Sequence, residues 1–175
     1  MRRLIVSFAL LGLLADLSCK TRKPKPEVLV DDTQAQLGSI VAANNPQTAA
    51  QLLRGFYDLE NGTWRWTMPK FAISFRPPVG AKEKGAQLKV DMVLPEVIFS
   101  KTGPIEITVS NNGKAIGKQK FSQAGDAKLA LAIPADLLGT EAVTLEFVLD
   151  KWLPPGPVDP RDLGMIFTSA GLSLP

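Results

Sequence analysis

From Trp64 to the end of the chain, apolar residues recur at every second position in short segments. Five of these segments alternate clearly with smaller or polar residues: Phe71-Ile73-Phe75, Leu88-Val90-Met92, Ile105-Ile107-Val109, Leu129-Leu131-Ile133 and Val143-Leu145-Phe147-Leu149. Successive side chains of a β-strand point to opposite faces, so each segment can bury one face and leave the other to solvent. This period predicts a β domain rather than a helical one.

Turn-forming residues separate the segments. They include Pro77-Pro78, Gly103-Pro104, Asn112-Gly113, Gly125-Asp126 and Gly139. With further strands over residues 64–67, 118–122 and 165–174, the pattern predicts about eight strands and a single helical turn over 134–139. The predicted fold class is therefore all-β, an antiparallel β-sandwich of jelly-roll type with one short N-terminal helix.

That helix is predicted in the segment before the strands. Asn45, Pro46 and Gly55 are placed as the N-cap, the first residue and the C-terminal stop of a helix of two to three turns. We therefore expect residues 37–55 to form a linker with a short helix, and residues 56–175 to form the β-sandwich domain.

Basic and apolar residues dominate the N-terminal end. Arg2 and Arg3 precede an apolar run over residues 4–14, which is shorter than the roughly 20 residues of a membrane-spanning helix. Leu17-Ser18-Cys19 follows, with Asp16 where bacterial lipoproteins usually have leucine. Residues 1–18 resemble a lipoprotein signal peptide, and the resemblance implies lipidation of Cys19; a plain secretory signal is the alternative.

The resemblance also implies a cellular location. The chain would be exported to the bacterial cell envelope and anchored there through its lipid, at the outer membrane or facing the periplasm. Residues 19–36 combine basic side chains and prolines without apolar periodicity. We expect them to form a flexible tether between the anchor and the domain.

The composition excludes several kinds of chemistry. The chain has no histidine, and Cys19 is its one cysteine. Ser-His-Asp and Cys-His catalysis and zinc sites built from histidine or cysteine are therefore excluded. A net charge of +3 is too small to indicate a nucleic-acid partner. We expect no enzyme, cofactor or metal; the expected partners are the membrane and a glycan or an envelope protein.

Aromatic and charged side chains gather in residues 55–67, and a proline-rich loop covers residues 152–164. Flat aromatic rings stack on the apolar faces of sugars, while carboxylates and arginine bind sugar hydroxyls. These two segments therefore contain the candidate ligand-binding residues. They are Tyr57, Glu60, Trp64, Arg65, Trp66, Trp152, Asp159 and Arg161.

The same residues also suit a structural role, which we favour. Trp64 and Trp66 would pack together on one face of a strand. Arg65 and Arg161 would pair with carboxylates at Glu60, Asp159 or Asp162 and pin the 152–164 loop to the 55–67 segment. Exposure separates the alternatives: an aromatic ring on a concave, solvent-facing surface favours sugar binding, whereas burial of all the rings favours a scaffold.

Several short motifs follow one another in a familiar order. They are Gly55-Phe56-Tyr57-x-x-Glu60, Arg65-Trp66-Thr67, Asn112-Gly113, Trp152-x-Pro154 and Asp159-x-Arg161-x-Leu163-Gly164. Together they resemble a bacterial β-sandwich module found beside glycosyltransferases and in cell-surface polysaccharide proteins. The resemblance covers residues 55–174, implies a jelly-roll-like sandwich in a glycan setting and brings no catalytic residues. We expect non-enzymatic binding of carbohydrate or another envelope component; an envelope scaffold without sugar binding is the alternative.

Overall fold

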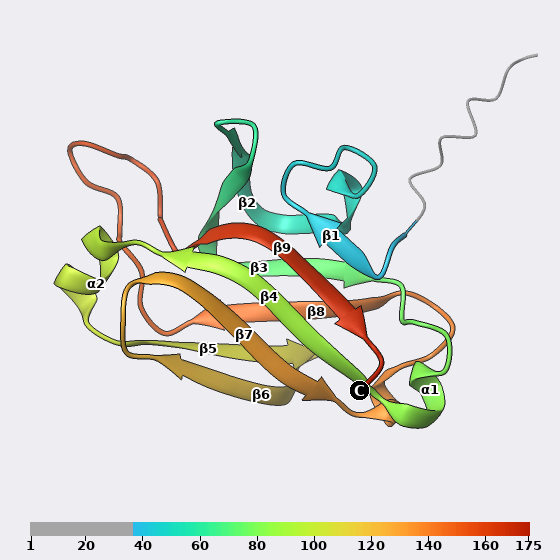
Figure 1. Ribbon diagram of the computed structural model, residues 1–175. Helices are drawn as coiled ribbons and strands as arrows, with labels where there is room; N and C mark the ends of the chain where they lie inside the picture. The colour runs from blue at the N-terminus through green and yellow to red at the C-terminus, as the bar shows by residue number, and fades with distance from the viewer. Residues whose placement is uncertain (1–36) are drawn as a thin grey trace, which may run out of the picture. The chain divides into compact units, whose positions relative to one another are not determined.

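The computed structural model describes residues 37–175, and antiparallel strands dominate this part of the chain (Figure 1). The strands are β1 (Ile40–Ala42), β2 (Leu52–Glu60), β3 (Trp64–Phe75), β4 (Ala86–Leu94), β5 (Ile105–Asn111), β6 (Lys114–Phe121), β7 (Gly125–Ile133), β8 (Val143–Leu149) and β9 (Ile166–Ser173). The helical elements are the short helices α1 (Ala81–Lys84) and α2 (Glu96–Thr102) and the 3-10 turns η1 (Ala49–Gln51) and η2 (Ala135–Leu137). No helix within residues 37–175 is long and apolar enough to cross a membrane.

The sheet folds over on itself to form two layers. Its strand order is β6-β5-β8-β3-β9-β4-β7, and β1 and β2 attach to β9 and β3. The fold-over lies between β3 and β9, which pair only through Arg65 with Phe167 and Trp66 with Ile166. In Figure 1, β4, β7 and β9 lie in front of β3, β5 and β8. The predicted all-β sandwich class is confirmed.

The core lies between the layers and uses the alternating residues. Phe71 of β3 stacks on Phe147 of β8 with 4.7 Å between the ring centroids, because the two residues are direct cross-strand partners. Large, fully buried side chains come from both layers: Phe75, Leu88, Ile107, Leu129 and Phe167. Each of the five alternating segments of the sequence lies within one strand.

Two Asn-Gly pairs close hairpins in the way their chemistry favours. Asn112 and Gly113 have φ values of 48° and 79°, and Asn61 and Gly62 have φ values of 50° and 67°. Positive φ at both central residues is the requirement of a type I′ turn. The first pair joins β5 to β6 as predicted, and the second joins β2 to β3.

The segment over residues 37–55 differs from the prediction. In place of a helix of two to three turns it contains β1, the single 3-10 turn η1 and the start of β2. Leu52 and Arg54 are strand residues that pair with Ile73 and Ala72 of β3. Short isolated helices gain little stability, so pairing with a long neighbouring strand prevails over the local capping signals.

Gly55 lies where β2 packs most closely on β3. Arg54 pairs with Ala72, whereas Phe56 pairs with Thr67, so the register shifts sharply at the residue between them. A Cβ atom on Gly55 would lie 2.7 Å from the Cα of Phe71, and the φ of Gly55 is +79°. Only glycine fits here, and its backbone lets β2 cover β3 and bring the 56–60 segment to the candidate site.

Candidate functional site

Arg161 is the centre of the largest charged cluster that sequence analysis singled out. Its Nη1 donates to Oε1 of Glu60 over 2.7 Å, and its Nη2 donates to Oδ2 of Asp159 over 2.9 Å. The guanidinium carbon lies 5.1 Å from the ring centroid of Tyr57. Because Glu60 and Tyr57 belong to β2, these contacts fasten the 152–164 loop to the 55–67 segment, as predicted for Arg161.

The electrostatics of this cluster do not suit Asp159 as the general acid of a glycosidase. Hydrogen bonds from the side chain and the backbone N–H of Arg161 hold the pKa of Asp159 below its usual range. The side-chain hydrogen bonds to Asp159 and Glu60 raise the pKa of the Arg161 guanidinium. A glycoside hydrolase needs one carboxyl group that stays protonated as the general acid. Asp159 is shifted in the opposite direction, and Glu60 is occupied by the same arginine.

Arg65 has different partners from those predicted. No carboxylate pairs with it among the described residues; its Nε donates to the carbonyl oxygen of Ala43 over 3.0 Å, and its Nη1 donates to that of Tyr57 over 3.1 Å. Both acceptors are backbone oxygens, and the guanidinium supplies each with a hydrogen-bond donor. The predicted ion pair of Arg65 is therefore wrong, and Arg65 ties the β1 region to β2.

Trp64 and Trp66 form one aromatic pair. Their ring centroids lie 6.1 Å apart at an interplanar angle of 83°, an edge-to-face contact of two residues on the same face of β3. Both side chains are half-buried, and Trp66 packs against the hydrophobic core. Packing is thus the role that the structure shows for this pair.

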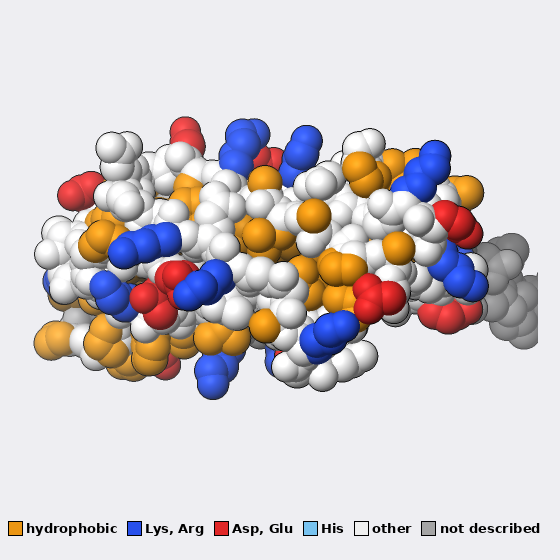
Figure 2. All heavy atoms as spheres, turned by 90° about the horizontal axis from the view of Figure 1, so that it is seen from below, with side chains coloured by type: hydrophobic (Ala, Val, Ile, Leu, Met, Phe, Trp, Pro, Cys, Tyr) orange, Lys and Arg blue, Asp and Glu red, His pale blue; other side chains and the backbone are white. Residues whose placement is uncertain are grey.

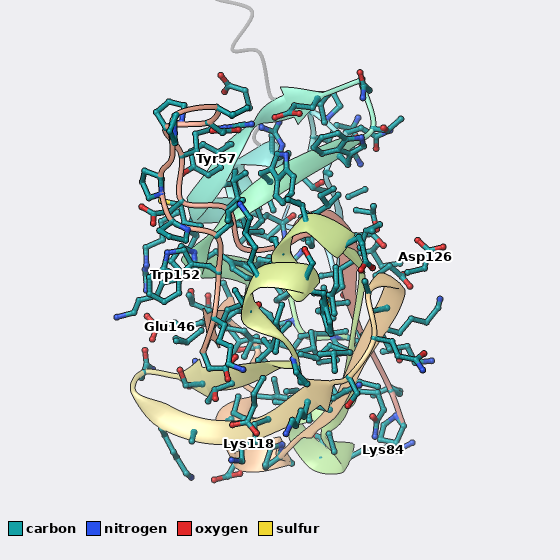
Figure 3. All side chains as sticks on the ribbon, turned by 90° about the vertical axis from the view of Figure 1, so that its left-hand side faces the viewer. Tyr57, Lys84, Lys118, Asp126, Glu146 and Trp152 are labelled. Atoms are coloured by element: carbon teal, nitrogen blue, oxygen red, sulfur yellow. The ribbon has the colours of Figure 1, made fainter. Side chains whose placement is uncertain are left out.

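Trp152 is the exposed aromatic residue of the set, with 36% of its surface accessible. Its Nε1 donates to Oδ1 of Asp162 over 2.8 Å, and the backbone oxygen of Asp162 accepts from the Tyr57 hydroxyl over 3.1 Å. The indole is therefore held in one orientation by a residue that Tyr57 holds in turn. Figure 3 labels Trp152 and Tyr57 on the same side of the domain.

A shallow hollow of about 350 Å³ lies beside the indole. Thr102, Lys151, Trp152 and Pro154 line it. The ammonium of Lys151 donates to the carbonyl oxygens of Thr102 and Pro104 over 3.0 and 2.9 Å. These bonds fix the Lys151 side chain beside the ring and leave the hollow almost entirely apolar.

The structure thus divides the predicted site residues. It brings Tyr57, Glu60, Asp159 and Arg161 together in one network and joins Trp152 to it through Asp162. Asp162, predicted as a possible partner of Arg65 or Arg161, instead bonds to Trp152 and Tyr57. Cys19 lies outside the described residues. Within residues 37–175, no group of three or more metal-ligating side chains is close enough to hold a metal ion.

The Arg161→Ala substitution is expected to lower the free energy of unfolding by about 1–2 kcal/mol, because it leaves two carboxylates without their hydrogen-bonded partner. Urea denaturation measures this change. Arg54→Ala is the matched control, since its ion pair with Glu146 is more exposed and is expected to contribute less than about 1 kcal/mol. Equal losses in the two variants would contradict a structural role for the Arg161 cluster.

No protein-family model and no curated protein sequence matches this chain. The solved structures similar to it include the CBM51-2 and INT domains of Clostridium perfringens ZmpB, free and in complex with GlcNAc, each with 12% identity and a TM-score of 0.33. The match covers 77% of this chain and 28% of each solved chain. At this TM-score the likeness decides neither the fold nor the ligand, and the predicted link to glycosyltransferases stays a prediction.

Proposed function

We propose that this protein is a non-enzymatic binding module that takes carbohydrate on the exposed face of Trp152. One observation carries the proposal: the indole is solvent-accessible, borders an apolar hollow and is held in place by Asp162. A ring fixed before binding loses little conformational entropy when a ligand stacks on it. The other three large aromatic side chains of the candidate set are half-buried.

The surroundings of Trp152 supply the second requirement of sugar binding, which is a set of hydroxyl partners. The second oxygen of the Asp162 carboxylate has no hydrogen-bond donor among the described residues and can accept from a sugar hydroxyl. Lys151 uses two N–H groups on carbonyl oxygens and keeps a third that can donate. A pyranose ring lying on the indole would therefore meet an acceptor and a donor.

The test is a glycan array probed with the full chain and with the Trp152→Ala variant. Loss of the stacking surface is expected to weaken glycan binding at least about tenfold, equivalent to about 1.4 kcal/mol, with little change in stability. Val158→Ala is the matched control, because Val158 lies in the same loop and is 99% exposed. Retention of no glycan by the wild-type chain at millimolar concentration would overturn the proposal.

The proposal includes export to the bacterial envelope and lipidation of Cys19, which the signal-like residues 1–18 support. Metabolic labelling with a fatty acid carrying an alkyne is expected to tag the wild-type chain, and the Cys19→Ser variant is expected to lose the tag, because the lipid is attached to the cysteine sulfur through a thioether. Equal labelling of the two chains would contradict lipidation at this residue.

A second candidate, an envelope scaffold that contacts another protein, is favoured by the apolar character of the same region. Figure 2 shows hydrophobic side chains gathered at the end of the domain that carries α2 and the 152–164 loop in Figure 1. Val97 of α2, Trp152 and Val158 are exposed apolar residues of these elements. Capture of one specific envelope protein, lost with Trp152→Ala and without any glycan retained, would select this candidate.

A further inference from the structure

The hollow beside Trp152 is apolar because the polar groups of its lining residues are engaged elsewhere in the domain. The Thr102 hydroxyl donates to the carbonyl oxygen of Ile98 over 3.0 Å, within helix α2. The indole Nε1 donates to Asp162. Two N–H groups of the Lys151 ammonium are held by carbonyl oxygens at the C-terminal end of α2. The side-chain donors therefore face away from the hollow.

Carbon atoms make up what remains of the lining. Thr102 contributes its methyl group because its hydroxyl turns to the α2 backbone, Lys151 contributes its methylene stem, and Pro154 has no N–H. The near absence of polar surface in the lining places the remaining N–H of Lys151 outside the hollow. A sugar hydroxyl placed here would lose hydration without gaining a hydrogen bond, whereas a methyl group would gain from burial.

We propose that this site selects a sugar that carries a methyl group on a ring substituent, with that methyl in the hollow and the ring against Trp152. The inference rests on the carbohydrate-binding function proposed above and deepens it. Two substituents supply such a group: the acetamido group of an N-acetylated amino sugar and the C6 carbon of a 6-deoxy sugar. Glucose and galactose carry hydroxyl groups at the corresponding positions.

The size of the hollow sets the length of the ligand segment that it takes. Its volume of about 350 Å³ lies at the small end of the range of ligand sites, so it suits one sugar residue. Burial of a single methyl group favours binding by about fourfold. The selectivity that we expect is therefore modest but measurable between sugars that differ in one substituent.

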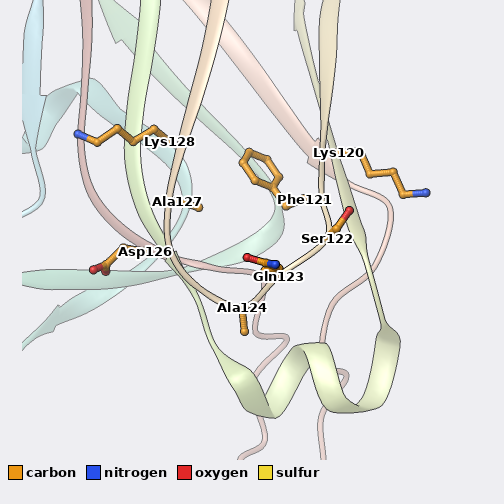
Figure 4. A pocket seen from close by; sticks show the side chains of 8 residues that line it. All are labelled: Lys120, Phe121, Ser122, Gln123, Ala124, Asp126, Ala127 and Lys128. Atoms are coloured by element: carbon orange, nitrogen blue, oxygen red, sulfur yellow. The ribbon is translucent and has the colours of Figure 1, made fainter.

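A larger hollow of about 440 Å³ between β6 and β7 provides an internal control (Figure 4). The charged side chains of Lys120 and Asp126 point away from it on opposite sides. They cannot converge on one sugar, in contrast to the groups around the indole. We therefore expect the backbone amides of Ser122 and Gln123, which also line this hollow, to stay unmoved with every sugar.

The test is an NMR titration of the isotope-labelled full chain with two matched pairs of sugars. The first pair is D-galactose and D-fucose, its 6-deoxy form, and the second is glucose and N-acetylglucosamine. The indole N–H signal of Trp152 reports binding. In at least one pair, the methyl-bearing sugar is expected to bind about fourfold more tightly than its partner. The pair that shows the difference identifies the substituent.

Two variants of Thr102 locate the origin of the preference. Thr102→Leu fills the hollow, so the ratio of affinities within the pair is expected to fall to about one while the sugars still shift the indole signal. Thr102→Val is the matched control, because it loses the same hydrogen bond to Ile98 without filling the hollow. The ratio of about fourfold should persist in Thr102→Val.

The failure of this inference differs from the failure of the proposed function. An indole signal that none of the four sugars shifts would overturn both. Indole shifts with equal affinities within both pairs, or with tighter binding of glucose and galactose, would refute only the preference for a methyl group. A preference that survives in Thr102→Leu would also refute it, since the selectivity would then arise outside the hollow.

Discussion

Replacement of Gly55 by alanine is expected to destabilise the domain by about 4 kcal/mol. Two costs combine: an L-residue at φ +79° is strained by roughly 1–2 kcal/mol, and the new Cβ would meet the backbone of β3 at Lys70 and Phe71. The neighbouring backbone cannot move away, because Phe71 is stacked on Phe147 and fully buried. A loss of this size is a large share of the 5–15 kcal/mol that holds a typical domain folded.

Gly62→Ala provides the matched control for this prediction. Gly62 also has a positive φ, +67°, but a Cβ there would meet nothing within 4 Å. Only the conformational cost of about 1–2 kcal/mol is therefore expected. Urea denaturation of the two variants compares the costs directly. If Gly55→Ala lost no more stability than Gly62→Ala, β2 would not pack on β3 as described.

The Gln51→Ala substitution is expected to lower the free energy of unfolding by about 3 kcal/mol. Gln51 is 1% exposed, and its carboxamide accepts from the Gly38 N–H over 2.8 Å and donates to the carbonyl oxygens of Gly38 and Ser74 over 3.0 and 2.7 Å. Alanine leaves the Gly38 N–H and the Ser74 carbonyl oxygen without this partner, whereas the Gly38 oxygen keeps the Arg76 N–H over 3.0 Å. Each unsatisfied buried group costs about 1–3 kcal/mol. Part of the loss is recovered if water enters the space.

Gln119→Ala is the control, since it removes a carboxamide that also bridges backbone groups but is more accessible. Gln119 is half-buried and makes two such bonds, so a loss of about 1 kcal/mol is expected. Thermal unfolding followed by circular dichroism distinguishes the variants. A Gln51→Ala midpoint equal to that of Gln119→Ala would show that the hydrogen bonds between Gln51 and Gly38 contribute little to stability.

Much of the fold was predictable because its signals are local. Alternation places Phe71, Ile73 and Phe75 on one face whatever their partners are, and Asn112-Gly113 selects a tight hairpin by its own backbone preference. The strand β2 was missed because Gly55 interrupts its pattern, and its pairing with β3 depends on contacts between backbones. The helix α2 was also missed, although Pro95 and Gly103 flank it in sequence.

The candidate site was predictable only in part. Arginine and carboxylates attract each other in any compact arrangement, so a link between Arg161 and Glu60 followed from residue types. The partners of Arg65 are the backbone oxygens of Ala43 and Tyr57, which no side chain marks in the sequence. The separation of β6 and β7 to opposite ends of the strand order was not predicted, because nothing local shows that two consecutive strands belong to opposite layers.

The sequence alone determined that residues 64–175 form alternating antiparallel strands, that Asn-Gly turns connect some of them, and that the chain has no histidine for catalysis. These properties depend on neighbouring residues and on composition. Only the tertiary structure decided which aromatic side chain is accessible: Trp66 packs on the core, whereas Trp152 is held at the surface by Asp162. Accessibility is decided by residues distant in sequence, since strand pairing and layer packing determine which faces water reaches.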